Sequence, residues 1–333
     1  MRRFKPSDIA GRFVKNQSYA KRASAFIEQM DRSPNDNTYY EAFLLEPYLS
    51  IGEDLVAGNN VFLIAPAGSG KSVFMRFMFD LLKTSMKNVK ICSTTGKSAI
   101  GLSASARTFH STFGIGLCQG DMFDILGRID GNYRMKKAIE NMNMCMIDEV
   151  SMLGASVLDK TSFAAEWIRR FKNIVDQYEA SLPQSERHYH DDSADVVIHS
   201  LDNPEYPQLK DVAAFGGIQI FVTGDPMQLP AINDKFFFES GTWKKGKFRV
   251  HRLSKLWRYK NVPFANMLLR IRVCEHTERD IKKIMDRMYA YQNKEYIDET
   301  GILPTRVYPI NRSVNAHNPV SYTHLTLPTK RIV

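Results

Sequence analysis

The stretch with the clearest chemistry is APAGSGKS at residues 65–72, which follows a short apolar run and opens a segment of helical periodicity. Gly68 and Gly70 permit backbone conformations that other residues avoid, so successive backbone N–H groups can surround phosphate oxygens. Lys71 is placed to reach the β- and γ-phosphates, and Ser72 to hold Mg²⁺. The pattern predicts a phosphate-binding loop of eight residues: Ala65, Pro66, Ala67, Gly68, Ser69, Gly70, Lys71 and Ser72.

Two more sets of polar residues stand where apolar runs end. Asp148 and Glu149 follow the run MCMI at 144–147. In P-loop enzymes the first such carboxylate holds Mg²⁺, and the second is placed to take a proton from the attacking water. Adjacent acids at a strand end are also common as solvated caps, so this pair depends on the phosphate loop for its interpretation. Gln228, in GDPMQLP at 224–230, carries an amide that donates to a γ-phosphate and accepts from water, which predicts a sensor of ATP against ADP.

Four apolar runs of strand length must position these side chains. They span residues 61–65, 90–94, 144–147 and 219–223. Segments of helical periodicity, such as 73–83 and 158–172, separate them. Alternating strands and helices indicate a parallel sheet covered by helices on both faces, and continuous apolar runs are typical of strands buried in such a sheet. The sequence therefore predicts an α/β fold of the P-loop NTPase type.

The composition excludes several classes of protein. The chain has 333 residues, of which 44% are hydrophobic and 11% aromatic, enough to bury a core and to exclude wholesale disorder. The four cysteines include no CxxC pair, which excludes a disulfide scaffold and a cysteine zinc site and suits a reducing compartment. No window approaches the roughly 18 uninterrupted apolar residues of a membrane helix, so no membrane partner is expected.

The net charge of +9 is unevenly distributed. Basic residues gather in residues 1–22 and 243–290, whereas residues 176–211 are strongly acidic. A basic protein often binds nucleic acid. We interpret the N-terminal run as a solvated or phosphate-contacting arm in preference to a targeting peptide. The polar stretch 181–210 predicts an exposed insertion, and its HYHDD segment at 188–192 is interpreted as a flexible loop in preference to a metal site.

The order of the motifs resembles superfamily 1 DNA helicases of the Pif-one (petite integration frequency) and RecD-like branch. The most specific segments are residues 108–116 and 216–230, and the resemblance covers roughly residues 50–318. It rests on APAGSGKS, STTGKSA, RTFHSTFGIG, IDEVSML, FVTGDPMQLPAI and LSKLWR, together with LDKTSFAAEWIRR, FFFESGTWKK and FANMLLRIRVCEHT.

The resemblance implies roles for residues that their spacing alone does not assign. Arg258 of LSKLWR matches the arginine that stabilises charge developing on the γ-phosphate. Small polar groups suit contact with DNA phosphates, which positions a strand without reading its sequence. His110 has an alternative interpretation as a buried, hydrogen-bonded histidine, and Phe109 and Phe113 are expected in the core. Six residues match the DNA-contacting motifs of the family: Thr95, Gly96, Lys97, Thr108, His110 and Ser111.

By the same resemblance we expect an ATP-dependent DNA helicase, with ATP and Mg²⁺ as cofactors and with single-stranded and duplex DNA as partners. It would move 5′→3′ along single-stranded DNA by alternating the grip of two RecA-like domains. The implied pathways are DNA repair, DNA recombination and telomere maintenance, and the implied location is the cytoplasm of a bacterial or virus-infected cell. The alternative is a nucleotide-regulated DNA-binding module without motor activity.

The predicted organisation has four parts: a basic arm at 1–45, a RecA-like motor domain at 46–245, a linker and the start of a second RecA-like domain at 246–318, and a tail at 319–333. Residues 302–310 are expected to form the first strand of the second sheet. The tail resembles a translated transposase-based sequencing adapter, which predicts a truncated gene read through into adapter sequence. The rest of the second RecA-like domain would then be missing, and we expect the ATPase and helicase activity of this fragment to be impaired. Two positions depart from the family pattern: residues 46–60 contain no Gln to read adenine, and Tyr259 stands where Gln usually follows Arg258.

Overall fold

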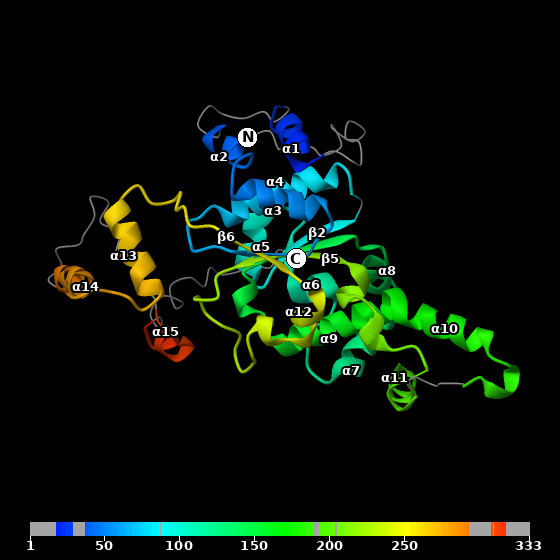
Figure 1. Cartoon of the computed structure of the whole chain (residues 1–333). Helices are drawn as coiled ribbons and strands as arrows, with labels where there is room; N and C mark the ends of the chain where they lie inside the picture. The colour runs from blue at the N-terminus through cyan, green and yellow to red at the C-terminus, as the bar shows by residue number, and fades with distance from the viewer. Residues whose placement is uncertain are drawn as a thin grey trace, which may run out of the picture. The chain divides into compact units, whose positions relative to one another are not determined.

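A parallel sheet of six strands forms the centre of the fold (Figure 1). The computed structural model describes residues 18–28, 37–86, 88–188, 193–203, 205–292, 308 and 310–317. The strands lie in the order β3-β2-β4-β5-β1-β6, and every neighbouring pair is parallel. Their bounds are β1 Val61–Ile64, β2 Val89–Ser93, β3 Arg107–Thr108, β4 Met144–Asp148, β5 Gln219–Gly224 and β6 Arg249–Arg252.

The four apolar runs of the sequence are strands β1, β2, β4 and β5, so the predicted parallel sheet is confirmed. Strands β3 and β6 were not predicted. They are the two edges of the sheet, β3 has only two residues, and β6 (RVHR) is polar and largely exposed. An edge strand has one neighbour and less burial, and therefore lacks the continuous apolar signal of a central parallel strand.

The described residues form fifteen α-helices. The helix expected at 158–172 is present as α9, a π-helical turn at Trp167–Phe171 and the start of α10. The helices are α1 Tyr19–Glu28, α2 Asn37–Ala42, α3 Tyr48–Val56, α4 Lys71–Lys83, α5 Gly96–Leu102, α6 Phe109–Phe113, α7 Met122–Asp130, α8 Tyr133–Asn141, α9 Ala155–Glu166, α10 Lys172–Ser181, α11 Ser193–Asp202, α12 Gly241–Gly246, α13 Val262–Arg272, α14 Glu278–Gln292 and α15 Asn311–His317.

Helices cover both faces of the sheet, as predicted (Figure 1). Successive strand residues point to opposite faces, and the buried clusters follow this period of two. In β4, Met144 and Met146 pack with α1, α3 and α4, whereas Cys145 and Ile147 pack with α6, α7 and α9. Phe109 and Phe113 are fully buried in the second cluster, which confirms them as core residues.

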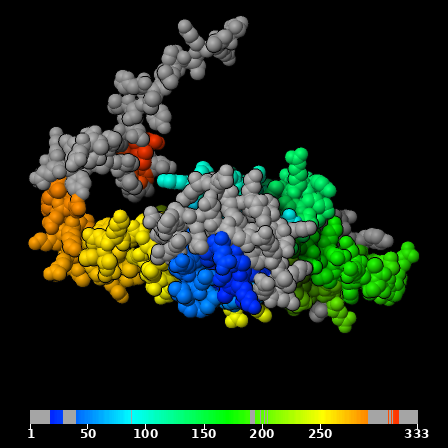
Figure 2. All heavy atoms as spheres, turned by 90° about the horizontal axis from the view of Figure 1, so that it is seen from above, coloured from blue at the N-terminus to red at the C-terminus, as the bar shows by residue number. Residues whose placement is uncertain are grey.

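The first face carries an aromatic cluster that holds the N-terminal helices in place. Phe43 contacts the rings of Tyr48, Phe74 and Phe77 at centroid distances of 5.0 to 5.1 Å. The hydroxyl of Tyr19 in α1 donates to the Phe43 carbonyl at 2.9 Å. Figure 2 looks onto this side of the molecule, with α1 in dark blue at the surface. Aromatic burial of this kind fixes α3 and α4 beside the phosphate loop.

The stretch predicted as an exposed insertion is exposed only in part. Helix α10 extends to one side of the sheet (Figure 1). Residues 181–188 are largely exposed, but Val196 of α11 and Tyr206 are buried. The Tyr206 hydroxyl donates to Glu179 Oε1 at 2.7 Å, and its ring packs against Tyr178 at 5.1 Å. These contacts fold the acidic stretch back onto α10.

The chain divides into two compact units, residues 1–274 and 275–333. Helices α14 and α15 belong to the second unit, and all six strands to the first. The predicted domain boundary at 245 stays a prediction. Residues 1–17 of the basic arm, most of the predicted strand at 302–310 and the whole tail at 319–333 lie outside the described residues. Within the described part, no helix is both long and apolar enough to span a membrane.

Candidate nucleotide and DNA site

The predicted phosphate loop links the end of β1 to the start of α4. Gly68 and Gly70 have φ values of +84° and +85°, the left-handed region that favours glycine. Gly70 is the N-cap of α4, so the first free N–H groups of that helix point into the loop. A helix N-terminus of this kind favours a bound phosphate, since its N–H groups and its dipole both attract negative charge.

Four side chains predicted to act on MgATP meet beside this loop. Lys71 Nζ lies 3.1 Å from Glu149 Oε1, and Ser72 Oγ donates to Asp148 Oδ2 at 3.0 Å. Lys71 and Asp148 are buried, with 8% and 2% of their surfaces exposed. A buried charge is tolerated when it is paired and hydrogen-bonded, and both conditions hold here. Ser72 and Asp148 offer the oxygen ligands that Mg²⁺ prefers, so this pair fits the ion.

Asp148 is the centre of a hydrogen-bond network that joins strands β4 and β5 to the start of α4. Its Oδ1 accepts from the Thr223 hydroxyl at 2.5 Å and from the Glu149 backbone N–H at 2.9 Å. Thr223 lies in β5, which separates β4 from β1 and the phosphate loop. Glu149 has a φ of +56°, an uncommon conformation for a residue with a side chain. The network holds that backbone turn, and with it the carboxylate that contacts Lys71.

The turn after β5 brings in a residue pair that the sequence did not indicate. Asp225 is buried, and its carboxylate accepts two bonds from Arg272, at 2.7 Å from Nε and 2.5 Å from Nη2. Burial alone raises the pKa of Asp225, but the Arg272 and Met227 N–H groups outweigh it and hold that pKa below its usual range. The backbone N–H of Gln228 donates to the Asp225 carbonyl at 2.9 Å, so Asp225 shapes the turn that presents Gln228.

The segment with Arg258 lies directly on the phosphate loop. The backbone N–H groups of Trp257 and Arg258 donate to the Gly68 carbonyl at 2.8 and 3.2 Å. A Cβ added at Gly68 would lie 2.9 Å from the Tyr259 ring and 3.0 Å from Arg258 Cβ, so no larger residue fits there. The structure thus brings Arg258 next to the loop, with its side chain exposed.

Residues 53–286 match the family model described as PIF1-like helicase, which covers more than half of the chain. The chain belongs to the PIF1-like helicase family. It is 29% identical over 273 residues to the ATP-dependent DNA helicase PIF1 of Saccharomyces cerevisiae, covering 78% of this chain and 26% of the relative.

Two solved structures support the RecA-like fold. The Pif1 helicase of Candida albicans matches with a TM-score of 0.62 at 22% identity, covering 90% of this chain and 55% of that one. A Bacteroides Pif1 helicase in complex with ADP-AlF3 and single-stranded DNA matches with a TM-score of 0.54 at 21% identity, covering 90% and 58%. The chain thus spans about a quarter of the yeast helicase and little more than half of each crystallised chain.

In this PIF1-like chain the six predicted DNA-contacting residues lie at the carboxyl ends of β2 and β3. Thr95 is the N-cap of α5 and accepts from the Ser98 N–H at 3.3 Å, and Thr108 is the N-cap of α6 and accepts from the Ser111 N–H at 3.2 Å. Gly96, Lys97 and Ser111 are exposed. This edge of the sheet is connected to the candidate nucleotide site by a hydrogen bond, in which the Thr94 hydroxyl donates to the Glu149 carbonyl at 2.9 Å.

His110 is half-buried beside Phe109, with ring centroids 6.2 Å apart. Burial lowers the pKa of His110 below its usual value, so the imidazole is neutral at neutral pH. A neutral, partly exposed ring is compatible with a hydrogen bond to DNA but supplies no charge. The structure therefore leaves the DNA-contacting role of His110 as a prediction.

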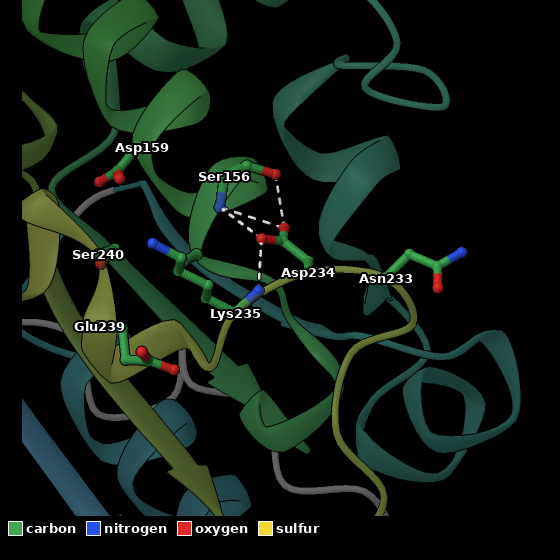
Figure 3. A pocket seen from close by; sticks show the side chains of 8 residues that line it. Ser156, Asp159, Asn233, Asp234, Lys235, Glu239 and Ser240 are labelled. Atoms are coloured by element: carbon green, nitrogen blue, oxygen red, sulfur yellow. Dashed lines mark hydrogen bonds between the residues drawn. The ribbon is translucent and has the colours of Figure 1, made fainter.

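A pocket of about 730 Å³ lies between α9 and the loop that joins β5 to α12 (Figure 3). Its carboxylates are engaged by backbone groups. Asp234 accepts from the Ser156 hydroxyl at 2.5 Å and from the Ser156 N–H at 3.1 Å, next to the N-terminus of α9. Asp159 of α9 in turn accepts from the Gly241 and Thr242 N–H groups at the start of α12. The acidic side chains of the pocket therefore cap the N-termini of α9 and α12, each from a segment distant in the sequence.

The sequence did not predict four contacts at the site. They are Thr223 with Asp148, Arg272 with Asp225, Tyr259 with Gly68, and Tyr48 with Ser69, whose carbonyl accepts from the Tyr48 hydroxyl at 3.3 Å. Tyr48 lies in the stretch where the family's adenine-reading Gln is missing. Apart from Tyr259, which stands out as a departure, none of them carries a local signal. No group of three or more His, Cys, Asp or Glu in the described residues is arranged to hold a metal, and Tyr189–Asp192 lie outside them.

Proposed function

We propose that this chain contains the ATP-hydrolysing part of a DNA helicase that translocates 5′→3′ on single-stranded DNA and unwinds duplexes. The observation that carries the proposal is the meeting of Lys71 with Glu149 and of Ser72 with Asp148 beside a glycine loop at a helix N-terminus. Membership of the PIF1-like family supports the choice of DNA as the partner. DNA repair, recombination and telomere maintenance in a bacterial or viral system are the pathways we propose for it.

Each residue has a task in this proposal. The loop N–H groups bind the β- and γ-phosphates, and Lys71 leaves Glu149 to contact them. Glu149 then takes a proton from the water that attacks the γ-phosphorus in line, while Gln228 donates to the γ-phosphate and orients that water. Arg258 stabilises the charge that develops on the transferred group. A Mg²⁺ ion held by Ser72 and Asp148 would neutralise part of the phosphate charge.

The DNA strand is proposed to run over the residues at the ends of β2 and β3. The exposed Lys97 and Ser111 would contact backbone phosphates, which gives binding without sequence preference. The Thr94–Glu149 bond connects this surface to the general base, so DNA binding can alter the position of Glu149. This connection supports hydrolysis that is stimulated by DNA.

The test is the rate of ATP hydrolysis by the 333-residue chain with and without single-stranded DNA. We expect a low rate of hydrolysis in the wild-type chain, and we expect DNA to stimulate it. Glu149→Gln removes the general base and should lower the stimulated rate about 100-fold or more, with ATP binding retained. Lys71→Ala should lower both the rate and the affinity for ATP. Lys172→Ala, an exposed lysine of α10, is the matched control and should leave both unchanged.

Two results would lead to other conclusions. ATP and DNA binding without DNA-stimulated hydrolysis would favour the nucleotide-regulated DNA-binding module. Full hydrolysis by both Lys71→Ala and Glu149→Gln would refute the assignment of this site. Strand separation and its direction are then measured on forked and tailed duplexes with the longest natural form of the protein.

A further inference from the structure

Helix α13 contacts both ends of the nucleotide site. At its N-terminal end, Phe264 packs against Tyr259 at a centroid distance of 6.0 Å, and Tyr259 lies on Gly68 of the phosphate loop. At its C-terminal end, Arg272 binds Asp225 in the turn that carries Gln228. A helix of 11 residues is about 16 Å long, so α13 bridges two parts of the site that are separate in the chain.

The Arg272–Asp225 contact is strong because both partners are well placed. Two N–H groups of the guanidinium donate to the two oxygens of one carboxylate, the geometry that gives arginine its specificity. Only 1% of the Asp225 side chain is exposed, so water screens the pair little. Loss of Arg272 would leave a buried, partly unpaired carboxylate.

Asp225 connects Arg272 directly to Gln228. Its carbonyl accepts from the Gln228 backbone N–H, its Oδ1 accepts from the Met227 N–H at 3.1 Å, and its carboxylate also interacts with the Gln228 side chain. The Asp225 carboxylate therefore lies at the centre of the turn at 225–228, and its ion pair with Arg272 helps to hold that carboxylate in position. A movement of Gln228 toward a γ-phosphate must either carry Arg272 with it or strain this pair.

Apolar packing holds α13 only weakly. Of its residues only Ala265 and Met267 are buried, while Val262 and Phe264 are exposed. The first compact unit ends at Cys274, two residues after Arg272. The ion pair is therefore placed at the point where the chain leaves the unit that contains the sheet.

We propose that Arg272 is a positioning residue, whose ion pair with Asp225 holds Gln228 in place for the γ-phosphate and links γ-phosphate binding to the position of α13. This inference rests on the proposed function, because it requires that Gln228 contacts ATP. Arg272 would act through Asp225 and not by contact with the nucleotide.

The test is the ratio of affinities for a non-hydrolysable ATP analogue and for ADP, both fluorescently labelled, measured on the 333-residue chain. Arg272→Gln should lower the affinity for the ATP analogue about tenfold and leave the ADP affinity within about twofold, since ADP lacks the phosphate that Gln228 contacts. Arg272→Lys keeps the positive charge but not the paired geometry, so its affinity for the ATP analogue should lie between those of the wild type and Arg272→Gln. Arg279→Gln, the same change at an exposed residue of α14, is the control.

A purely structural contact would behave differently. It would lower both affinities together with the thermal midpoint, and that outcome, or an unchanged ratio in Arg272→Gln, would overturn the proposal. If the wild-type chain binds the analogue and ADP equally, γ-phosphate sensing by Gln228 fails, and this inference fails with it. If the wild-type chain discriminates and Arg272→Gln does so equally well, the proposed function stands and only the role of Arg272 is refuted.

Discussion

At the scale of single residues, the site is organised by buried carboxylates and not by exposed charge. Asp148 and Asp225 are almost fully buried, and each is held by at least three hydrogen-bond donors. A carboxylate in such a place is costly unless its oxygens are bonded, so its partners are constrained to fixed positions. Asp148 bonds the Glu149 N–H, and Asp225 bonds the turn that contains Gln228, so the two acids help to fix the backbone at both residues.

A third partly buried acid, Asp80 of α4, predicts a pH effect. Burial raises its pKa to about 6, although Lys83 and Arg76 act in the opposite direction. Between pH about 4 and about 6, Asp80 is protonated in the folded state but ionised in the unfolded state. The free energy of unfolding therefore decreases as pH rises through that range. Asp80→Asn removes the titrating group. The thermal midpoint of this variant, relative to that of the wild type, should therefore rise between pH 4.5 and pH 6.5. A constant difference across that range would contradict the assignment.

At the scale of elements, the loop between β5 and α12 is fastened at both ends. Asp225 binds Arg272 at its start, and Asp234 caps α9 through Ser156 at its end (Figure 3). Between these anchors Leu229 and Ile232 are 73% and 88% exposed. An apolar loop tip is kept in solvent because the charged residues that flank it are bonded elsewhere.

Asp234→Ala should therefore loosen this loop and uncap α9. We expect a loss of about 1–2 kcal/mol in the free energy of unfolding, measured in urea, because the Ser156 N–H loses its acceptor. Cleavage by protease within residues 227–235 should become faster. Asp234→Asn keeps one carbonyl oxygen and should cost less. Gly154→Ala should also destabilise, since its Cβ would overlap the Asp234 carboxylate. Unchanged stability in Asp234→Ala would show that the cap contributes nothing.

At the scale of the whole molecule, the candidate nucleotide site lies within the first compact unit. The phosphate loop, the carboxylates of β4, the Gln228 turn and α13 all precede Cys274. A unit with its own sheet and two buried clusters has the core needed to fold by itself.

A chain that ends at Cys274 should therefore keep its cooperative thermal transition and its affinity for ADP. A chain that ends at Lys260 loses α13 and Arg272 and should keep ADP binding while its preference for the ATP analogue falls, as in Arg272→Gln. Calorimetry and nucleotide titration of the two chains give the comparison. Loss of the transition in the longer truncation would show that the second unit is needed for the first to fold.

Much of the fold follows from local patterns. The glycine loop, the four central strands and the alternation with helices depend on contacts within a few residues and on continuous burial, and both leave marks in the sequence. The edge strands leave no such mark. For the acidic stretch, composition predicted exposure, but Val196, Tyr206 and Val212 are buried, and Tyr206 contacts α10.

The sequence by itself determined that residues 65–72 have the pattern of a phosphate loop, because glycine and the start of a helix are local requirements. Only the tertiary structure decided which groups meet there. Thr223 reaches Asp148 because β5 lies between β1 and β4, and Arg272 reaches Asp225 across 47 positions of the chain. Strand order and helix placement are set by the packing of the whole core, so no pattern within a short segment could have predicted these pairs.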